Sequence, residues 1–523
     1  MPFFRATLLF FCVVLAFPTF PQNSTKANDS DKPLRVEIPA RSSNETYRII
    51  TCGTKGLIMF FRSQEITDES CTNWYFSFYD TNMQQVWVKR IPLLNDLEYR
   101  FHQFGADTLA LLFVSGGKSR STDNKFEIVR VLLNKGTFVL NKGKLQLESD
   151  VAAFGIQKGR AWLAINMKEH SGSILNIRLK QGAERTFSLG LGHLISVRWM
   201  NPDTSSFEVS AIVSRQISKK GVEYYFVCYD TAGLIKREAL IGSKEGTREL
   251  NHFQVISTQP GAFLLLGSYV QGTTSSTRKN KNPDESTGFF ASSVKNSVQK
   301  SINFYNFLEL QNANSLLGER DIINLKKKAL KKNKPLTEYS LDFPVLLQNI
   351  IRFNDQYILS AELFSPQYRT ENFTDFDYYG RPYTNSYSVF DGYRFENAIV
   401  AGFDGDGRLI WDNMLEIRNL VSPELSPKVV VFPAGNEQVL CYINDGKIGS
   451  KIIRGNKVVE KLDFAPIDLL YPEDKLLSET KGRLIPWYAN YFLSYGYQEI
   501  KNIALESNNK RLVFYFSKVR FEK

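Results

Sequence analysis

Short apolar runs with alternating polar residues recur along the whole chain, separated by turn-forming residues. The best-preserved example is 399–415, in which two alternating runs flank Asp404-Gly405-Asp406-Gly407. Alternation with a period of two predicts half-buried β-strands, and the Asp-Gly pairs supply the left-handed backbone positions that a tight hairpin needs. We interpret this stretch as a β-hairpin, with Trp411 on its second strand packing between repeated units.

Weaker copies of this hairpin return at intervals of roughly 45–65 residues, each beside two further short strands, which is the period and strand number of β-propeller blades. The run at 34–38 stands alone near the N-terminus, whereas the last unit has only three predicted strands. We therefore predict an all-β chain in which 34–523 form a β-propeller of eight four-stranded blades, closed by the strand at 34–38. Seven blades remain the alternative, if one weak unit is misread.

Two segments interrupt the strand pattern. Within 309–342, the spacing of apolar residues predicts a helix over 314–332, and Pro335 ends it. The segment carries the densest charge of the chain, the Lys-rich run at 326–334, which we interpret as the solvated face of a helical insertion between blades five and six. Docking of this run to an anionic surface is the alternative. The second interruption, 366–396, is rich in tyrosine and is expected to be a loop insertion.

The N-terminus has the pattern of an export signal. Arg5 precedes an apolar run of about eleven residues, too short to span a bilayer. We predict a signal peptide over 1–22 and a flexible leader over 23–33. No later apolar run approaches the roughly 18 residues of a membrane-spanning helix. The expected location is therefore the periplasm, the cell surface or the extracellular medium.

Charge and cysteine content refine this picture. The formal charge is +11, but Lys and Arg are spread over most predicted strands, so we expect a solubilising role and no nucleic-acid partner. Cys52 and Cys71 lie at the ends of neighbouring strand-like runs, and an exported protein favours a disulfide between them. Cys228 and Cys441 sit inside apolar strands and are expected to be small buried side chains.

Catalytic signals are few. None of the four histidines is paired at metal-ligand spacing, and no nucleophile elbow, P-loop or dinucleotide-binding glycine motif is present. The alternating carboxylates at Asp404 and Asp406 lack the rest of a calcium loop, because Leu409 and Ile410 stand where ligands are needed. We predict no catalytic residue, metal or cofactor. Paired carboxylates for glycan cleavage stay open, since 54 acidic residues offer many pairs.

The tyrosine-rich insertion is the strongest candidate for binding. Tyrosine rings stack on sugars or on partner side chains, while hydroxyls and carboxylates form hydrogen bonds. Long insertions on a rigid repeat scaffold are also where binding residues usually lie. The predicted ligand-binding residues are Tyr378, Tyr379, Tyr383, Tyr387, Tyr393, Asp375 and Asp377. The alternative is that the insertion packs on the protein itself as a cover.

The segments YDTNMQQVWVKRI, YDTAGLIKREAL and FDGDGRLIWDNML resemble the strand–turn–strand of quinoprotein-like propeller repeats. Only Trp87 and Trp411 keep the tryptophan of that pattern, so a quinone cofactor is not expected. The tyrosine-rich insertion, VFDGYRFENAIVAGFDGDGRLIWDN and PWYANYF together are similar to secreted β-propeller proteins of Bacteroidetes. This resemblance implies location and fold and no activity.

The sequence thus favours an exported, non-catalytic binding or scaffolding propeller of the cell envelope, with a protein or a glycan as ligand. The alternative is a carboxylate-dependent glycan hydrolase or lyase on one propeller face. A third class is an assembly factor that binds strands of other proteins by edge pairing.

Overall fold

The structure of the protein is a computed structural model. It describes residues 34–43, 45–66, 70–105, 107–115, 124–146, 148–167, 171–179, 184–187, 194–202, 208–217, 221–242, 248–271, 284–312, 323–324, 327, 330–331, 341–502 and 509–521. The predicted signal peptide and leader lie outside the described residues. The predicted helix over 314–332 lies almost wholly outside them too, so the structure gives no support to a helical insertion.

The described chain is almost entirely β-structure, and its strands form eight sheets. The first three sheets hold β2 (Arg48–Thr51), β3 (Leu57–Ile66), β4 (Cys71–Tyr79) and β5 (Gln85–Leu94); β6 (Leu97–Gly105), β7 (Thr108–Ser115), β8 (Asn124–Leu132) and β9 (Thr137–Leu145); β10 (Ser149–Gln157), β11 (Arg160–Met167), β12 (Gly172–Arg178) and β13 (Glu184–Phe187). The next two hold β14 (Ile195–Pro202), β15 (Val209–Gln216), β16 (Val222–Tyr229) and β17 (Ile235–Ile241); β18 (Arg248–Gln259), β19 (Ala262–Gln271), β21 (Gly288–Lys295) and β22 (Val298–Asn306).

The sixth sheet is the largest, with β20 (Glu285–Ser286), β23 (Phe343–Leu347), β24 (Ile351–Phe353), β25 (Gln356–Phe376), β26 (Pro382–Phe403) and β27 (Leu409–Ser422). The last two sheets hold β28 (Val430–Ala434), β29 (Glu437–Asn444), β30 (Lys447–Arg454) and β31 (Lys457–Pro466); β32 (Asp474–Tyr488), β33 (Tyr491–Asn502), β34 (Lys510–Arg520) and β1 (Arg35–Pro39). Two 3₁₀ turns, η1 (Gly53–Lys55) and η2 (Phe307–Glu309), complete the described elements.

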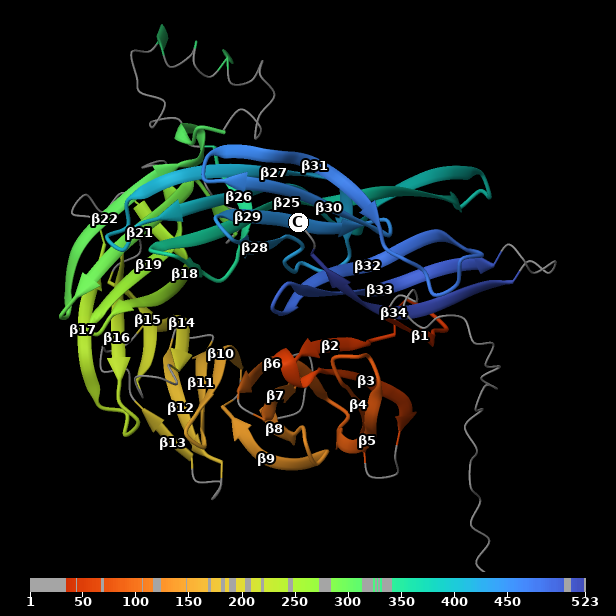
Figure 1. The fold of residues 1–523 in the computed structure, drawn as a ribbon, viewed down its shortest axis with the longest axis horizontal. Helices are drawn as coiled ribbons and strands as arrows, with labels where there is room; N and C mark the ends of the chain where they lie inside the picture. The colour runs from red at the N-terminus through yellow and green to blue at the C-terminus, as the bar shows by residue number, and fades with distance from the viewer. Residues whose placement is uncertain are drawn as a thin grey trace, which may run out of the picture.

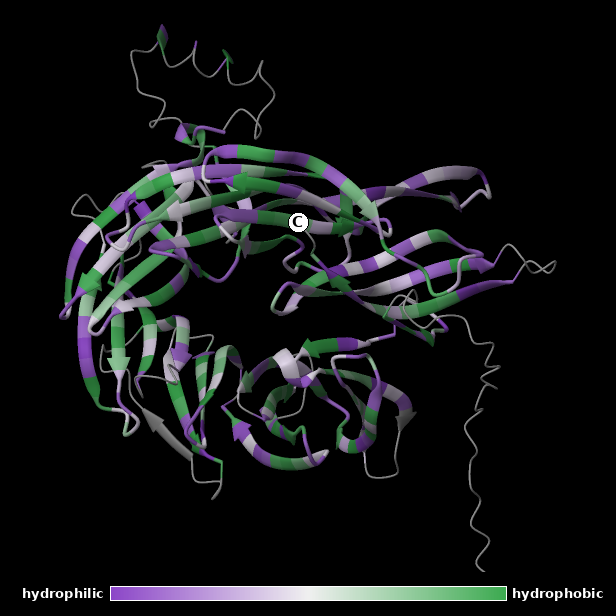
Figure 2. Cartoon of the chain, in the orientation of Figure 1, coloured by the Kyte–Doolittle hydropathy of each residue, from purple (hydrophilic) through white to green (hydrophobic). Residues whose placement is uncertain are grey.

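The sheets follow one another around a central axis, and the first strand of a sheet lies nearer the centre than the last (Figure 1). This is the arrangement of a β-propeller, so the predicted all-β repeat fold is confirmed. Hydrophobic and hydrophilic residues alternate along the strands (Figure 2), which lets both faces of a sheet contribute apolar side chains to its neighbours. Aromatic pairs join successive sheets: Trp74 of β4 packs edge-on against Phe113 of β7, with 4.9 Å between ring centres.

The two faces of the ring differ, because consecutive strands run antiparallel. Turns between first and second strands, and between third and fourth strands, reach one face; examples are 52–56 and 404–408. We name this the short-turn face. Turns between second and third strands, together with the connections from sheet to sheet, reach the opposite face. The turn 377–381 and the connection 423–429 lie there, and we name it the hairpin face.

The ring closes through its N-terminal strand. β1 pairs antiparallel with β34, Val36 opposite Phe516 and Ile38 opposite Phe514, and so completes the last sheet. Arg35 is buried there: its guanidinium donates to Gln498 Oε1 at 2.7 Å and lies 4.2 Å from the ring centre of Tyr515. The last sheet then contacts the first one, where Trp487 Nε1 donates to the carbonyl of Gly56 at 3.0 Å.

The segment 399–415 is the hairpin between β26 and β27. Its Asp404 Oδ1 accepts backbone N–H bonds from Asp406 at 2.9 Å and Arg408 at 2.8 Å. The carboxylates of Asp80, Asp230 and Asp377 accept the same two bonds in other turns. These aspartates hold turns, as predicted, and the ring of Trp411 is buried with a hydrogen bond to Gln356 Oε1 at 2.8 Å.

The predicted Cys52–Cys71 disulfide is wrong for this structure, which has no disulfide bond between these two residues. Cys52 precedes β3 on the short-turn face, whereas Cys71 begins β4 at the hairpin-face end of the same pair of strands. The length of β3, about 30 Å at roughly 3.3 Å per residue, separates them, and a disulfide needs Cα atoms within about 7 Å. Cys228 and Cys441 are buried free thiols.

A buried carboxylate ties the sixth sheet to the seventh. Glu362 of β25 accepts hydrogen bonds from the backbone N–H groups of Lys428 at 2.9 Å and Val429 at 3.0 Å, just before β28 begins. It also accepts a hydrogen bond from the side-chain amide of Gln348. Burial raises the pKa of Glu362 to about 7, against the opposing effect of these hydrogen bonds.

We predict that replacing Arg35 with alanine weakens closure of the ring. The change removes the cation from Tyr515 and leaves the buried Gln498 oxygen without this donor, so the free energy of unfolding should fall by about 2–4 kcal/mol. Urea unfolding measures it. Lys89→Ala, on the exposed outer strand β5, is the control and should change little. Equal stability of R35A and wild type would contradict this role.

We also predict a specific pH dependence from Glu362. Its folded pKa lies above its ordinary value of 4.5, so the protonated form favours folding. The contribution of Glu362 to the free energy of unfolding is complete below about pH 4.5 and is lost as the pH rises through about 7. Between pH 5 and 7 the wild type should lose about 1–3 kcal/mol of stability that Glu362→Gln does not lose. Glu460→Gln, on exposed β31, is the matched control. Parallel pH–stability curves for wild type and E362Q would refute the assignment.

Candidate functional site: a projecting hairpin

The tyrosine-rich segment is an ordered hairpin, and the prediction of a loop is wrong. β25 and β26 pair from Tyr357 opposite Phe403 to Phe376 opposite Pro382. The alternation of side chains continues through the segment, so strands persist where composition indicated a loop. The hairpin extends beyond the ring on the right of Figure 1.

Both outer edges of the projecting part are unpaired. On one side β23 pairs with β25 only as far as Leu363, and on the other β27 pairs with β26 only as far as Tyr393. Among the described strands, none adds to the hairpin beyond these points. The stretch 368–390 therefore presents free backbone N–H and C=O groups along two strands.

The two faces of this ribbon differ in chemistry, because paired residues share a face. One face carries no charged side chain. We name it the uncharged face, formed by Tyr368, Thr370, Asn372, Thr374, Phe376, Pro382, Thr384, Ser386, Ser388 and Phe390. The other we name the charged face, formed by Arg369, Glu371, Phe373, Asp375, Tyr383, Asn385, Tyr387 and Val389.

Side chains on the charged face bond to one another. Tyr387 Oη donates to Glu371 Oε2 at 2.5 Å, and Arg369 pairs with the same carboxylate at 2.7 Å. The hydrogen bond to Glu371 raises the pKa of Tyr387. Tyr383 Oη donates to Asp375 Oδ2 at 3.3 Å. These contacts link the two strands through side chains of the charged face.

The predicted binding residues fall in three places. Tyr378 and Tyr379 form the tip and are 97% and 80% exposed. Asp377 stabilises this turn, because its carboxylate accepts the backbone N–H groups of Tyr379 and Arg381. Tyr383, Tyr387 and Asp375 lie on the charged face. Tyr393 stands apart at the base, packed edge-on against Phe364 and Phe390 at 5.6 and 5.0 Å.

The predicted ligand-binding set leaves out four exposed aromatic residues of the insertion. Tyr368, Phe373, Phe376 and Phe390 are 61%, 45%, 62% and 44% exposed. Extending the period of two through 366–396 would have placed three of them on one face. Because these rings and those at the tip remain exposed, the alternative of a cover packed on the protein is not favoured.

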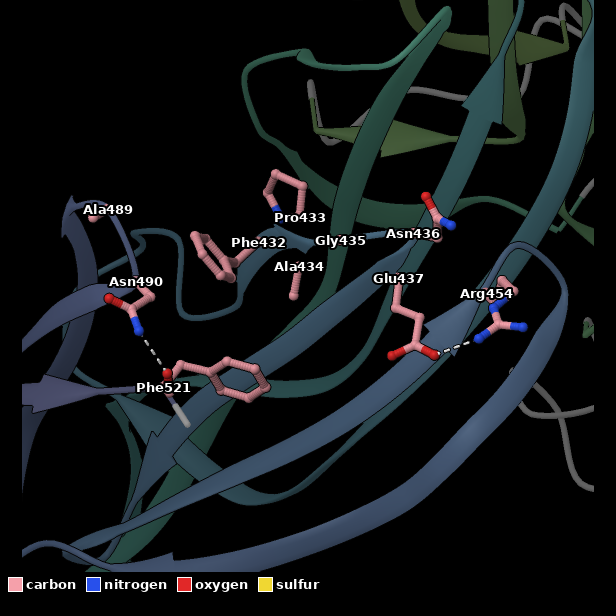
Figure 3. A pocket seen from close by; sticks show the side chains of 10 residues that line it. All are labelled: Phe432, Pro433, Ala434, Gly435, Asn436, Glu437, Arg454, Ala489, Asn490 and Phe521. Atoms are coloured by element: carbon pink, nitrogen blue, oxygen red, sulfur yellow. Dashed lines mark hydrogen bonds and ion pairs between the residues drawn. The ribbon is translucent and has the colours of Figure 1, made fainter. Parts of the chain in front are cut away.

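A shallow cavity of about 550 Å³ lies on the short-turn face between the β28–β29 turn, the β32–β33 turn and Phe521 (Figure 3). Its two charged residues neutralise each other, since Arg454 pairs with Glu437 at 2.7 Å. Asn490 Nδ2 donates to the carbonyl of Phe521 at 2.9 Å. The other lining residues are Asn436, a glycine and apolar residues, so the one carboxylate of this cavity, that of Glu437, is already paired.

The enzyme alternative requires acids with raised pKa that face a substrate. Burial raises the pKa of three described acids, Glu127, Glu362 and Glu479. Glu127 is buried in β8 and lies 3.2 Å from Lys142 Nζ, and the carboxylates of Glu362 and Glu479 are occupied by hydrogen bonds. Glu479 accepts hydrogen bonds from Tyr515 Oη at 2.6 Å, Gly446 N at 2.8 Å and Gln498 Nε2 at 3.0 Å. Glu362 and Glu479 each join one sheet to the next, so neither is placed as a catalytic group.

In the part of the chain that the structure describes, no cluster of three or more His, Cys, Asp or Glu residues is arranged to hold a metal ion. Within the same residues, no helix has the length and apolar character needed to cross a membrane.

Comparison with known proteins adds fold-level likeness only. No family model matches the chain, and no curated protein sequence matches it, so nothing at the level of sequence supports the resemblance to quinoprotein repeats or to Bacteroidetes proteins. Similar solved structures include the polysaccharide lyase Uly1, 10% identical over 80% of this chain and 89% of that one, with a TM-score of 0.38. The β-propeller domain of the Trilobed protease from Pyrococcus furiosus is 8% identical over 82% and 98%, with a TM-score of 0.35. Sqt1 of Saccharomyces cerevisiae is 8% identical over 94% and 100%, with a TM-score of 0.42.

Proposed function

We propose that the protein is an exported, eight-bladed propeller that serves as a binding or scaffolding protein of the cell envelope. The projecting hairpin holds an extended segment of a partner protein. The observation that carries this proposal is the ribbon 368–390, whose two edges are unpaired and whose aromatic side chains are exposed.

The unpaired edges favour a protein partner. A two-stranded ribbon alone is only marginally stable in water, and a third strand supplies regular backbone hydrogen bonds. A glycan has no backbone with which to extend the sheet. Strand addition also accounts for the length of the projection, which a tip for aromatic stacking alone does not need.

The uncharged face gives the partner its side-chain contacts. Tyr368 packs edge-on against Phe390 near the ring, and Phe376 lies at the outer end. Hydroxyl and amide side chains occupy the positions between them. Exposed aromatic rings with few charges are typical of the centre of protein interfaces. The partner therefore has an extended segment with apolar side chains on one face.

We predict that removing the projection abolishes partner binding and leaves the ring folded. In the test variant, Asn-Gly replaces 368–391 and joins Gln367 to Gly392, which are paired in the wild type. A photo-crosslinking residue at position 376 identifies the partner, and titration of that purified partner measures affinity. The dissociation constant should rise at least about 100-fold in the shortened protein.

The matched control is Val86→Ser with Val88→Ser, which removes exposed apolar side chains from β5 and should leave affinity unchanged. A crosslink to a glycan, a crosslink only to a second copy of this chain, or equal affinity of the shortened protein would each contradict the proposal.

A further inference from the structure

A second cavity lies where the first strands of three sheets meet. It measures about 370 Å³ and is lined by β2, β6 and β32, by rings from β33 and β34, by the residues that precede β2, and by Glu424 from the connection to β28. The residues before β2 and the connection to β28 both lie at the hairpin-face end of their strands. We name this cavity the axial pocket; it belongs to the same face as the hairpin.

Positive charge gathers in the axial pocket. Arg48, Lys481 and Arg483 line it, and Arg483 pairs with Glu424 at 2.6 Å. Arg48 lies 5.2 Å from the ring centre of Tyr99, and Lys481 lies 5.7 Å from that of Tyr497. Neither Arg48 nor Lys481 pairs with a carboxylate of the described chain.

The acids of the pocket offset only part of this charge. Glu424 is paired with Arg483, and Glu45 adds a second carboxylate. The lining residues therefore hold three cations, Arg48, Lys481 and Arg483, against two carboxylates. The buried Lys428 adds a further cation nearby; burial, and then the charge of Arg483, lower its pKa to about 8. A surplus of positive charge in a partly enclosed site attracts an anion.

Lys481 lies at an irregular point of the β32 backbone. Pairing of β32 with β33 shifts register between Thr480 and Arg483, so Lys481 lies in a bulge with φ of +55°. Gly482 beside it meets the carboxylate of Glu479 and the side chain of Ile443 where a Cβ would need space. A lysine in the left-handed region is uncommon, and bulges often re-aim a side chain at a functional site.

Aromatic rings supply the other walls. Tyr99 Oη lies 2.5 Å from His102 Nδ1, and Tyr47 stacks on Phe514 with ring centres 4.8 Å apart. Burial raises the pKa of Tyr99 to about 12, so its hydroxyl stays neutral at physiological pH. His102 is exposed at the pocket, but burial of its ring by the surrounding protein lowers its pKa and favours the neutral ring.

We propose that the axial pocket binds an acidic saccharide, with the carboxylate of a uronic acid residue between Arg48 and Lys481 and the sugar ring against the tyrosines. Guanidinium and ammonium groups match a carboxylate, and flat rings match the C–H faces of a sugar. The volume suits a short oligosaccharide segment. This site shares no residue with the hairpin, so the two proposals fail or succeed separately.

The test is calorimetric titration of the full chain with tri-galacturonate at low salt. Maltotriose is the neutral comparison, and a sulfated trisaccharide tests for any anion. We expect tri-galacturonate to bind, with at least tenfold weaker binding of the other two. Arg48→Gln and Lys481→Gln should each weaken tri-galacturonate binding about tenfold or more.

Lys475→Gln, an exposed position on the same strand, is the matched control and should bind as wild type does. The shortened-hairpin protein should also bind normally. Absence of tri-galacturonate binding to folded wild type, equal binding of maltotriose, preference for the sulfated sugar, or equal loss in K475Q and K481Q would overturn the proposal.

Discussion

The pairing of β1 with β34 is the constraint on which the rest of the structure depends. The ring closes because the N-terminal strand is part of the same sheet as the last three strands of the chain. Here the N-terminal strand supplies the outer strand of the last sheet, and Arg35 anchors it through Gln498 and the ring of Tyr515. Closure holds the last sheet against the first, where Lys518 Nζ donates to the carbonyl of Thr81 at 2.9 Å. The axial pocket needs this contact, because β2 and β32 form its walls together.

The two faces of the ring carry different structural features. Aspartate-held turns keep much of the short-turn face compact, as at Asp80 and Asp404. The hairpin face carries the connections between sheets, the projecting ribbon and the mouth of the axial pocket. A ligand in the pocket and a protein on the ribbon would therefore approach from the same side. A scaffold that joins an acidic glycan to an envelope protein is consistent with both proposals.

Local features could be predicted from the sequence, whereas features that depend on distant contacts could not. The period of two and the Asp-Gly turn gave the strands and the hairpin at 399–415. The segment 366–396 was predicted as a loop because its Tyr, Asp and Asn content outweighed its alternation. The Cys52–Cys71 disulfide is wrong because Cys52 precedes β3 and Cys71 follows it. The two residues therefore lie at opposite ends of that strand. The axial pocket brings Arg48 beside Lys481, and no local pattern marks residues so far apart in the chain.

The most direct test of this account is native-state hydrogen exchange across the closure. If β1 is an integral strand, the amides of Val36, Ile38 and Ala40, which point toward β34, and those of 513–517 should exchange as slowly as those in the centre of β33, through one common opening. Fast exchange of Val36, Ile38 and Ala40, while β33 stays protected, would contradict the account, because the ring would then stand without its N-terminal strand.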